Sequence, residues 1–180
     1  MRVADAQWPA WATEAVEVVP PNPGWQARGE QQCRDLERDL AGWLISPVEH
    51  IGSTAVPGLA AKPVLDFQAK VNDLGCVPEL ASVLGARGWH WVPVELDQRP
   101  WERFFVQVAR DRRRAHLHLV DPSEPQWSDR LVFRDALRSN SSLAADYARL
   151  KATLAVAHRT DREAYTRAKA AFITEVLARL

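Results

Sequence analysis

Hydrophobic and polar residues alternate in several short segments of the first two thirds of the chain. The alternation is sharpest over 62–71 (KPVLDFQAKV), which places polar side chains on one side of an extended backbone and apolar ones on the other. Further β-branched or aromatic segments occur at 14–19, 46–53, 89–94, 103–110 and 115–120. The pattern predicts a strand at each of these places, and the charged turn at 110–114 predicts that the last two strands form a hairpin.

Elsewhere in the chain apolar residues recur every three to four positions, which predicts helices. The first is expected over 25–44, and the second over 77–88. The chain after residue 125 is all helical in character, with Ser141 and either Thr160 or Asp161 as N-caps. The helices predicted there span 126–139, 141–158 and 161–179.

These elements predict an α+β fold, in which a mixed β-sheet with flanking helices is followed by a C-terminal helical segment. Residues 1–14 are expected to form a loose leader and residues 15–121 the α/β core. Residues 122–180 are expected to pack on that core, so that the chain forms one compact unit.

The composition narrows the classes of function. Because 23 Lys and Arg balance 23 Asp and Glu, the chain is not typical of a general nucleic-acid or membrane binder. No segment has membrane-spanning length, and the two cysteines, Cys33 and Cys76, fit neither a metal-ligand spacing nor a disulfide framework. We therefore expect a cytoplasmic protein. The arginine-rich turn at 110–114 suggests RNA as a candidate partner, but the balanced charge makes RNA the less favoured one. The sequence does not indicate an oligomeric state.

The stretch GSTAVPG, which begins at Gly52, is the first candidate for chemistry. A Gly-Ser turn at the end of a strand offers backbone N–H groups and the Ser53 hydroxyl to phosphate oxygens. A plain turn with a helix cap explains the same residues, and the GxxxxGK[ST] spacing of a P-loop is missing. The motif alone leaves both interpretations open.

Asp66 is the second candidate, because it lies between Leu65 and Phe67 in the clearest strand. A carboxylate buried in such a strand is costly unless it is paired, hydrogen-bonded or bound to a metal. The alternative is an edge strand whose polar side, which also carries Gln68 and Lys70, faces water.

His116 and His118 stand two residues apart and therefore point to one face of their strand. If this strand lies beside the Asp66 strand in matching orientation, both imidazoles join Asp66 and Gln68 in one polar patch. Such a patch suits a divalent transition ion, or a general base beside a phosphate. Two hydrogen-bonded histidines on an exposed sheet are the alternative.

The C-terminal helical segment contains three pairs of residues four positions apart, which therefore share a helix face. A lysine in such a pair can reach a phosphate across a cleft. Equally, the tyrosines can pack inside while the lysines stay at the surface. The pairs are Arg134 with Arg138, Tyr147 with Lys151, and Tyr165 with Lys169.

Taken together, these motifs resemble those of the GrpB family, whose members have a nucleotidyltransferase-like fold. The resemblance covers residues 16–180, and its central motif, EHIGSTAVPGLAAKPVLDF (49–67), is long and specific. The other matching stretches are VEVVPPNPGWQARGEQQ, HLHLV, FRDALR, YARLK and DREAYTRAKAAF. Some family members are fused to dephospho-CoA kinase.

The resemblance implies roles for individual residues. Gly52 and Ser53 match the Gly-Ser of the nucleotidyltransferase signature, and Asp66 matches its first metal-binding carboxylate. The signature has a second acidic residue two positions later, where this chain has Gln68. A neutral glutamine is a poor ligand for Mg²⁺, so a mechanism with two metal ions is not expected.

From this resemblance we expect transfer of a nucleotidyl group from an NTP to a small acceptor with one divalent ion, Mg²⁺ or Mn²⁺, with Zn²⁺ as a further candidate. The expected catalytic and metal-binding residues are Asp66, His116 and His118. The alternative is a non-catalytic module that binds a nucleotide, a CoA-like molecule or another phosphorylated ligand. The expected phosphate- or ligand-binding residues are Gly52, Ser53, Thr54, Lys62, Arg134, Tyr147, Lys151, Tyr165 and Lys169.

Overall fold

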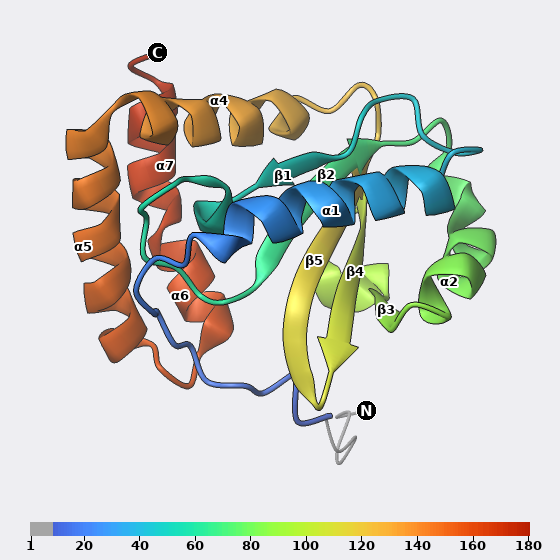
Figure 1. The fold of residues 1–180 in the computed structure, drawn as a ribbon, viewed down its shortest axis with the longest axis horizontal. Coiled ribbons are helices and arrows are strands. Elements are labelled where there is room, and N and C mark those ends of the chain that lie inside the picture. The colour runs from blue at the N-terminus through green and yellow to red at the C-terminus, as the bar shows by residue number, and fades with distance from the viewer. Residues whose placement is uncertain (1–8) are drawn as a thin grey trace.

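A five-stranded mixed sheet forms the centre of the molecule (Figure 1). The structure, a computed structural model, describes residues 9–180. The strands lie in the order β1-β2-β5-β4-β3. They are β1 (Glu49–Ile51), β2 (Leu65–Lys70), β3 (Trp89–Val92), β4 (Glu102–Ala109) and β5 (Arg112–Val120). The mixed sheet confirms the predicted fold class.

The pairing of β2 with β5 decides where the polar side chains gather. These two strands run parallel, whereas every other neighbouring pair in the sheet is antiparallel. In this register Asp66 lies opposite His116, and Gln68 lies opposite His118. Paired residues point to the same face of a sheet, so the structure confirms that these four side chains share one face.

The hairpin between β4 and β5 forms as predicted. Its two turn residues, Arg110 and Asp111, both have φ near +54°. Positive φ at both central positions gives the turn a twist that matches that of the flanking strands. Between this turn and His116 the register shifts at Gln107 and Val108, and beyond the shift His116 lies opposite Val106 on β4 and Asp66 on β2.

One face of the sheet packs against two helices to form the main core. These are α1 (Gly24–Asp39), which crosses in front of the sheet in Figure 1, and α2 (Val77–Gly85). Alternate residues of β2 and β5, among them Phe67 and Leu117, are fully buried in this core. The polar residues between them are therefore left on the opposite face. Three short elements complete this part of the chain: η1 (Ser53–Ala55), η2 (Leu74–Cys76) and α3 (Val94–Asp97).

The C-terminal helices form a second, smaller core with the segment that follows η1. Val56, Leu59, Leu137 and Tyr147 are its buried members, and Phe172 packs against them. This cluster fixes the η1 turn against the helices, which lie along the β1 side of the sheet in Figure 1. The helices are α4 (Gln126–Ser139), α5 (Ser141–Ala157), α6 (Arg162–Ala168) and α7 (Ala170–Leu177).

Side chains cover the outer edge of β1. The carboxylate of Glu37 accepts a hydrogen bond from the Val48 N–H at 3.0 Å. The guanidinium of Arg134 donates to the carbonyl oxygen of His50, also at 3.0 Å. These contacts attach α1 and α4 to the same edge strand from opposite sides.

Some predicted elements differ from those observed. The segment expected to form a strand at 14–19 is extended but has only one bridge, between Val19 and Ala61. It lies between the sheet and the C-terminal helices, and the Val16 N–H donates to the Arg159 carbonyl oxygen instead of to a neighbouring strand. The first helix ends at Asp39 and not at residue 44, although Leu40 and Leu44 beyond it still pack in the main core.

The helix expected over 161–179 is divided at Lys169 into α6 and α7. Asp161, one of the two residues predicted to cap the last helical segment, is the N-cap of α6. The predicted cap Ser141 is wrong, because the side chain of Asn140 accepts the Leu143 N–H at the start of α5. The sequence pattern also missed α3. Residues 1–8 of the expected leader lie outside the described residues; farther on, Trp11 stacks on His90.

Candidate functional site

Asp66 lies at the centre of the candidate site, on the polar face of β2. Its Oδ1 lies 2.8 Å from His116 Nδ1, and its side chain keeps 29% of its exposure to solvent. Gly52 packs directly against it, since a Cβ atom at position 52 would come within 2.6 Å of Asp66 Oδ2. Gly52 also has φ +69°, a conformation that L side chains rarely adopt. The glycine of the Gly-Ser turn is therefore what allows the carboxylate to lie beside the turn.

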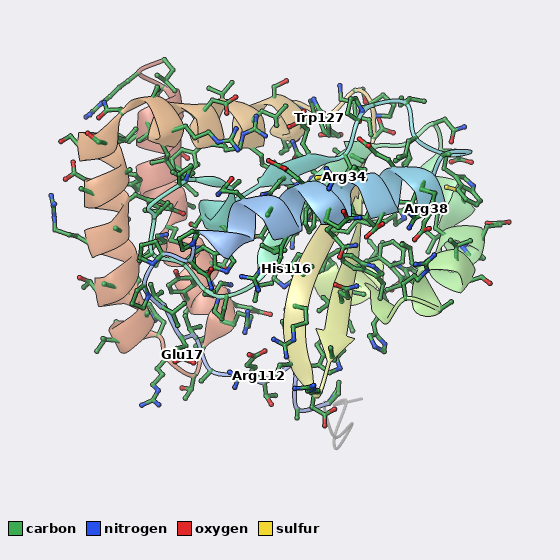
Figure 2. The ribbon with its side chains drawn as sticks, viewed as in Figure 1. Glu17, Arg34, Arg38, Arg112, His116 and Trp127 are labelled. Carbon is green, nitrogen blue, oxygen red and sulfur yellow. The ribbon has the colours of Figure 1, made fainter. Side chains whose placement is uncertain are left out.

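His116, labelled in Figure 2, lies on β5, and its hydrogen bonds define its tautomer. Arg113 Nη1 lies 3.4 Å from His116 Nε2, and a guanidinium can only donate. Nε2 is therefore the acceptor, and the proton on Nδ1 is donated to Asp66. Burial lowers the pKa of His116 to about 4, although Asp66 opposes this shift. The ring is neutral at pH 7.

Asp66 is ionised in this pair. Burial raises the pKa of its carboxyl, but the hydrogen bond from His116 and the positive charge of Lys62 outweigh burial, and the pKa lies well below its usual range. The site thus combines a carboxylate with a neutral imidazole.

Three lysines from three separate segments surround this pair. Lys62 precedes β2, Lys151 lies on α5, and Lys169 separates α6 from α7. The amines of Lys62 and Lys169 both lie over the ring of Tyr165, at 5.6 and 4.4 Å from its centre. We call Lys62, Lys151 and Lys169 the lysine cluster.

Lys151 connects the cluster to the Gly-Ser turn. Its Nζ donates to Ser53 Oγ at 2.8 Å and to the Ala60 carbonyl oxygen. It also lies 4.9 Å from the centre of the Tyr147 ring. Lys151 is only 2% exposed, while Ser53 is partly exposed.

The lysine cluster is electrostatically strained. Burial, and next the charges of Arg162 and Lys169, lower the pKa of Lys62 to about 7. Burial and Lys169 likewise lower the pKa of Lys151 to about 7. In the described part of the chain no member of the cluster forms an ion pair with a carboxylate, and Asp66 alone attracts all three. An anion bound here would relieve the repulsion.

A family model described as GrpB protein matches residues 15–179. The chain belongs to the GrpB family. UPF0157 protein PA4798 from Pseudomonas aeruginosa is 33% identical over 96% of this chain and 71% of its own length. The crystal structure of the conserved protein GrpB from Enterococcus faecalis superposes with a TM-score of 0.79 at 30% identity, over 91% of this chain and 96% of that one. The α+β fold with its C-terminal helices is thus that of a GrpB protein.

Other relatives of the GrpB family are longer than this chain. UPF0157 protein YqkA from Bacillus subtilis is 30% identical over 86% of the chain, which spans only 44% of YqkA. A dephospho-CoA kinase from Mycolicibacterium paratuberculosis is 27% identical over 88% of the chain, which again spans 44% of that protein. Among residues 9–180, the structure has no helix that is both long and apolar enough to cross a membrane.

The residues predicted from the family motifs fall into two groups. Those that gather around Asp66 are Gly52, Ser53, Lys62, His116, Tyr147, Lys151, Tyr165 and Lys169. Thr54, Arg134 and His118 make their side-chain hydrogen bonds to other residues. Thr54 Oγ1 pairs with His50 Nε2 at 3.0 Å on the core side of the turn.

Arg134 supports the sheet edge instead of the lysine cluster. Its Nη1 lies 2.7 Å from a Glu49 carboxylate oxygen, and its Nε bonds to Asp135. It lines a separate cavity of about 320 Å³ between α1, β1 and α4, together with Arg34 and Arg138.

His118 points toward a different buried acid. Its Nδ1 lies 3.2 Å from Glu102 Oε1, and Glu102, which is fully buried, also contacts Arg99 and Arg130 at 2.6 Å each. Gln68, beside His118, donates from Nε2 to the carbonyl oxygen of Trp127. Trp127, labelled in Figure 2, lies at the start of α4. At the second acidic position of the signature, this GrpB chain therefore uses a side chain that holds α4.

The donors around Asp66 do not fit a divalent ion. No three His, Cys, Asp or Glu side chains in residues 9–180 converge closely enough to hold one. Both ring nitrogens of His116 are engaged, and the remaining neighbours of Asp66 include the positively charged lysine cluster. The metal site expected from Asp66, His116 and His118 stays a prediction.

Sequence reasoning missed Arg162 on α6. It attracts Asp66 and repels Lys62, and its Nε and Nη1 are buried without a hydrogen-bond partner in the described structure. Arg162 stands three residues before Tyr165, so the helix period places both on one face. The same spacing argument that identified Tyr165 with Lys169 would have found it.

Proposed function

We propose that this GrpB protein binds the phosphate groups of a nucleotide or another phosphorylated small molecule at the lysine cluster. The observation that carries the proposal is the lysine cluster itself, three partly or fully buried amines around a single carboxylate. Lysine ammonium groups bind phosphate oxygens as point charges.

The surrounding groups suit such a ligand. Ser53 presents a hydroxyl beside Lys151, and Arg162 adds a fourth cation with unpartnered N–H groups. Asp66 repels a phosphate but accepts a hydrogen bond from a ligand hydroxyl, so it favours ligands that carry both groups, as nucleotides do. Similarity to proteins named dephospho-CoA kinase supports a CoA-like ligand as one member of this class.

A second candidate function is nucleotidyl transfer to a small acceptor. The observation that favours it is the ionised Asp66 beside a neutral His116, because such a carboxylate can take a proton from an acceptor hydroxyl. Release of pyrophosphate from an NTP in the presence of an acceptor would distinguish transfer from binding alone.

Isothermal calorimetry with inorganic pyrophosphate and with nucleoside phosphates tests the binding proposal. Lys169→Met should weaken binding about 10- to 100-fold, since a charge-assisted hydrogen bond contributes about 1.5–3 kcal/mol. Lys70→Met is the matched control, because Lys70 lies over Trp127 at the other end of β2 and should leave affinity unchanged. Equal loss in both variants, or no binding by the unmodified protein, would contradict the proposal.

A further inference from the structure

Ser53 and Lys151 form a close polar pair at the centre of the site. Their Oγ and Nζ atoms are 2.8 Å apart, although the residues come from η1 and α5, 98 positions apart in the chain. The serine is partly exposed and the lysine is almost completely buried. One partner is therefore available to a ligand while the other is shielded from water.

The surroundings hold the lysine amine in one place. The Ala60 carbonyl oxygen accepts one of its protons, and the face of Tyr147 lies beneath it. The charged groups that face it are Lys169, which repels a proton on the amine, and Asp66, which attracts one. The two hydrogen bonds of the Lys151 amine therefore point at the Ala60 carbonyl oxygen and the Ser53 hydroxyl.

An amine in this setting can act as a base. Burial and the charge of Lys169 bring its pKa to about 7, so a substantial fraction is neutral at physiological pH. A neutral amine has two protons and a lone pair. With one proton donated to Ala60, the lone pair can accept the Ser53 hydroxyl proton across the same 2.8 Å contact.

We propose that Ser53 is a nucleophile activated by Lys151, and that it takes up a phosphoryl group from the ligand bound at the lysine cluster. Serine is a weak nucleophile until an adjacent base removes its proton, and a lysine serves as that base in known serine–lysine pairs. The substrate class is a phosphate ester or anhydride with a good leaving group. The phosphoryl step rests on the proposed function, whereas the activation of Ser53 does not.

The step balances without a further reactant. The Ser53 oxygen forms a bond to phosphorus while the bond from phosphorus to the leaving oxygen breaks. The hydroxyl proton passes to the Lys151 amine, which becomes an ammonium, and the leaving group departs with its electron pair. Lys169, whose charge acts on the Lys151 amine, and Lys62, which lies over the same Tyr165 ring as Lys169, would balance the negative charge on the transferred group.

Two probes separate activation of the serine from binding of phosphate. Diisopropyl fluorophosphate is uncharged, so it labels an activated serine, with loss of fluoride, whether or not the lysine cluster binds anions. Acetyl phosphate is an anionic phosphoryl donor that needs both. Intact-protein and peptide mass spectrometry would locate each adduct, with the exposed Ser123 as an internal control.

We expect labelling at Ser53 and not at Ser123, with a rate that rises as the pH passes through 7. Lys151→Arg keeps a positive charge but cannot act as a base, and should slow labelling at least about 100-fold. Lys70→Met should label like the unmodified protein. If Lys151→Arg fails to fold, alkylation of Ser53→Cys by iodoacetamide reports the same base, because Lys151 should make that thiol react below its usual pH range.

The outcomes are distinct. Labelling of Ser53 that depends on Lys151 supports the pair, and an acetyl phosphate adduct extends it to phosphoryl uptake. Fluorophosphate labelling without pyrophosphate binding would support the pair and overturn the phosphate ligand. Pyrophosphate binding without any labelling, or labelling that Lys151→Arg leaves unchanged, would overturn the pair.

Discussion

At the scale of single residues, the site depends on Gly52, which has no side chain. Gly52 combines φ +69° and ψ −171°, a region open essentially to glycine alone, with close contact to Asp66. The Asp66 carboxylate can lie against the Gly-Ser turn only because Gly52 has no Cβ. A glycine that first suggested a phosphate-binding turn also makes room for the carboxylate.

Gly52→Ala should therefore destabilise the protein by about 1–3 kcal/mol and weaken pyrophosphate binding as well. Gly58→Ala is the matched control: Gly58 has φ +76°, but a Cβ there would meet no atom within 4 Å. It should cost backbone strain alone and leave binding intact. Urea unfolding and calorimetry measure the two effects, and equal behaviour of both variants would count against the contact between Gly52 and Asp66.

At the scale of elements, Glu102 on β4 connects its neighbour strand β5 with α4 and with the loop after α3. It lies fully buried between His118 on β5, Arg130 on α4 and Arg99 in the loop after α3. Burial disfavours its charge, but His118 and both arginines hold the pKa of its carboxyl well below the usual range. This network attaches Arg130, in the first turns of α4, to the sheet.

Glu102→Gln should lower the free energy of unfolding by about 3–5 kcal/mol, because it removes the fully buried carboxylate that pairs with the partly buried Arg130 and Arg99. Glu95→Gln, at an exposed position on α3, should change it little. Chemical denaturation followed by circular dichroism gives both values. A loss below about 1 kcal/mol for Glu102→Gln would mean that the network is dispensable for α4.

The sequence predicted the strands that carry the site, but it did not predict the network of charged side chains around Glu102. Alternation placed Asp66 and His116 on strands, and two-residue spacing placed His116 and His118 on one face, as observed. Spacing carries no information about rotamers, and so it could not show that His118 turns away toward Glu102. Glu102 itself begins a strand in an ordinary polar position, and only the folded structure shows that it is buried.

The sequence predicted members of the lysine cluster as separate Tyr-Lys pairs but did not predict that they form one cluster. Tyr-x-x-x-Lys spacing marked Lys151 and Lys169 as residues on the same helix faces as Tyr147 and Tyr165. That both faces turn toward Asp66 depends on how α5, α6 and α7 pack on the segment after η1, which is a tertiary arrangement. Sequence reasoning therefore found most members of the site without being able to show that they meet.

At the scale of the whole molecule, the lysine cluster makes folding sensitive to pH. Lys62 and Lys151 have pKa values of about 7 in the folded state, below their ordinary value near 10.5. Between these limits the unfolded chain binds more protons than the folded one, so stability rises with pH. Below pH 7 both states are protonated and the full cost of the buried charges remains.

Stability should therefore increase between about pH 7 and pH 8.5, by up to about 1.4 kcal/mol per pH unit for each lysine. Above that range Cys33, whose pKa burial raises to about 12, acts in the opposite direction, because its thiol ionises only in the unfolded chain. Lys151→Met should be more stable at pH 7 and have a shallower pH slope. Urea unfolding at several pH values measures this, and identical slopes in both proteins would exclude the lysine as the source.

The covered edge of β1 has a consequence for how copies of this protein meet. An edge strand with unpaired N–H and C=O groups invites another strand to add to it, which leads to aggregation. Here the N–H of Val48, the residue before β1, is already bonded to Glu37, and the carbonyl oxygen of His50 is bonded to Arg134. A foreign strand would have to displace both charged side chains before it could pair, so this edge is protected against growth of the sheet from one molecule into the next.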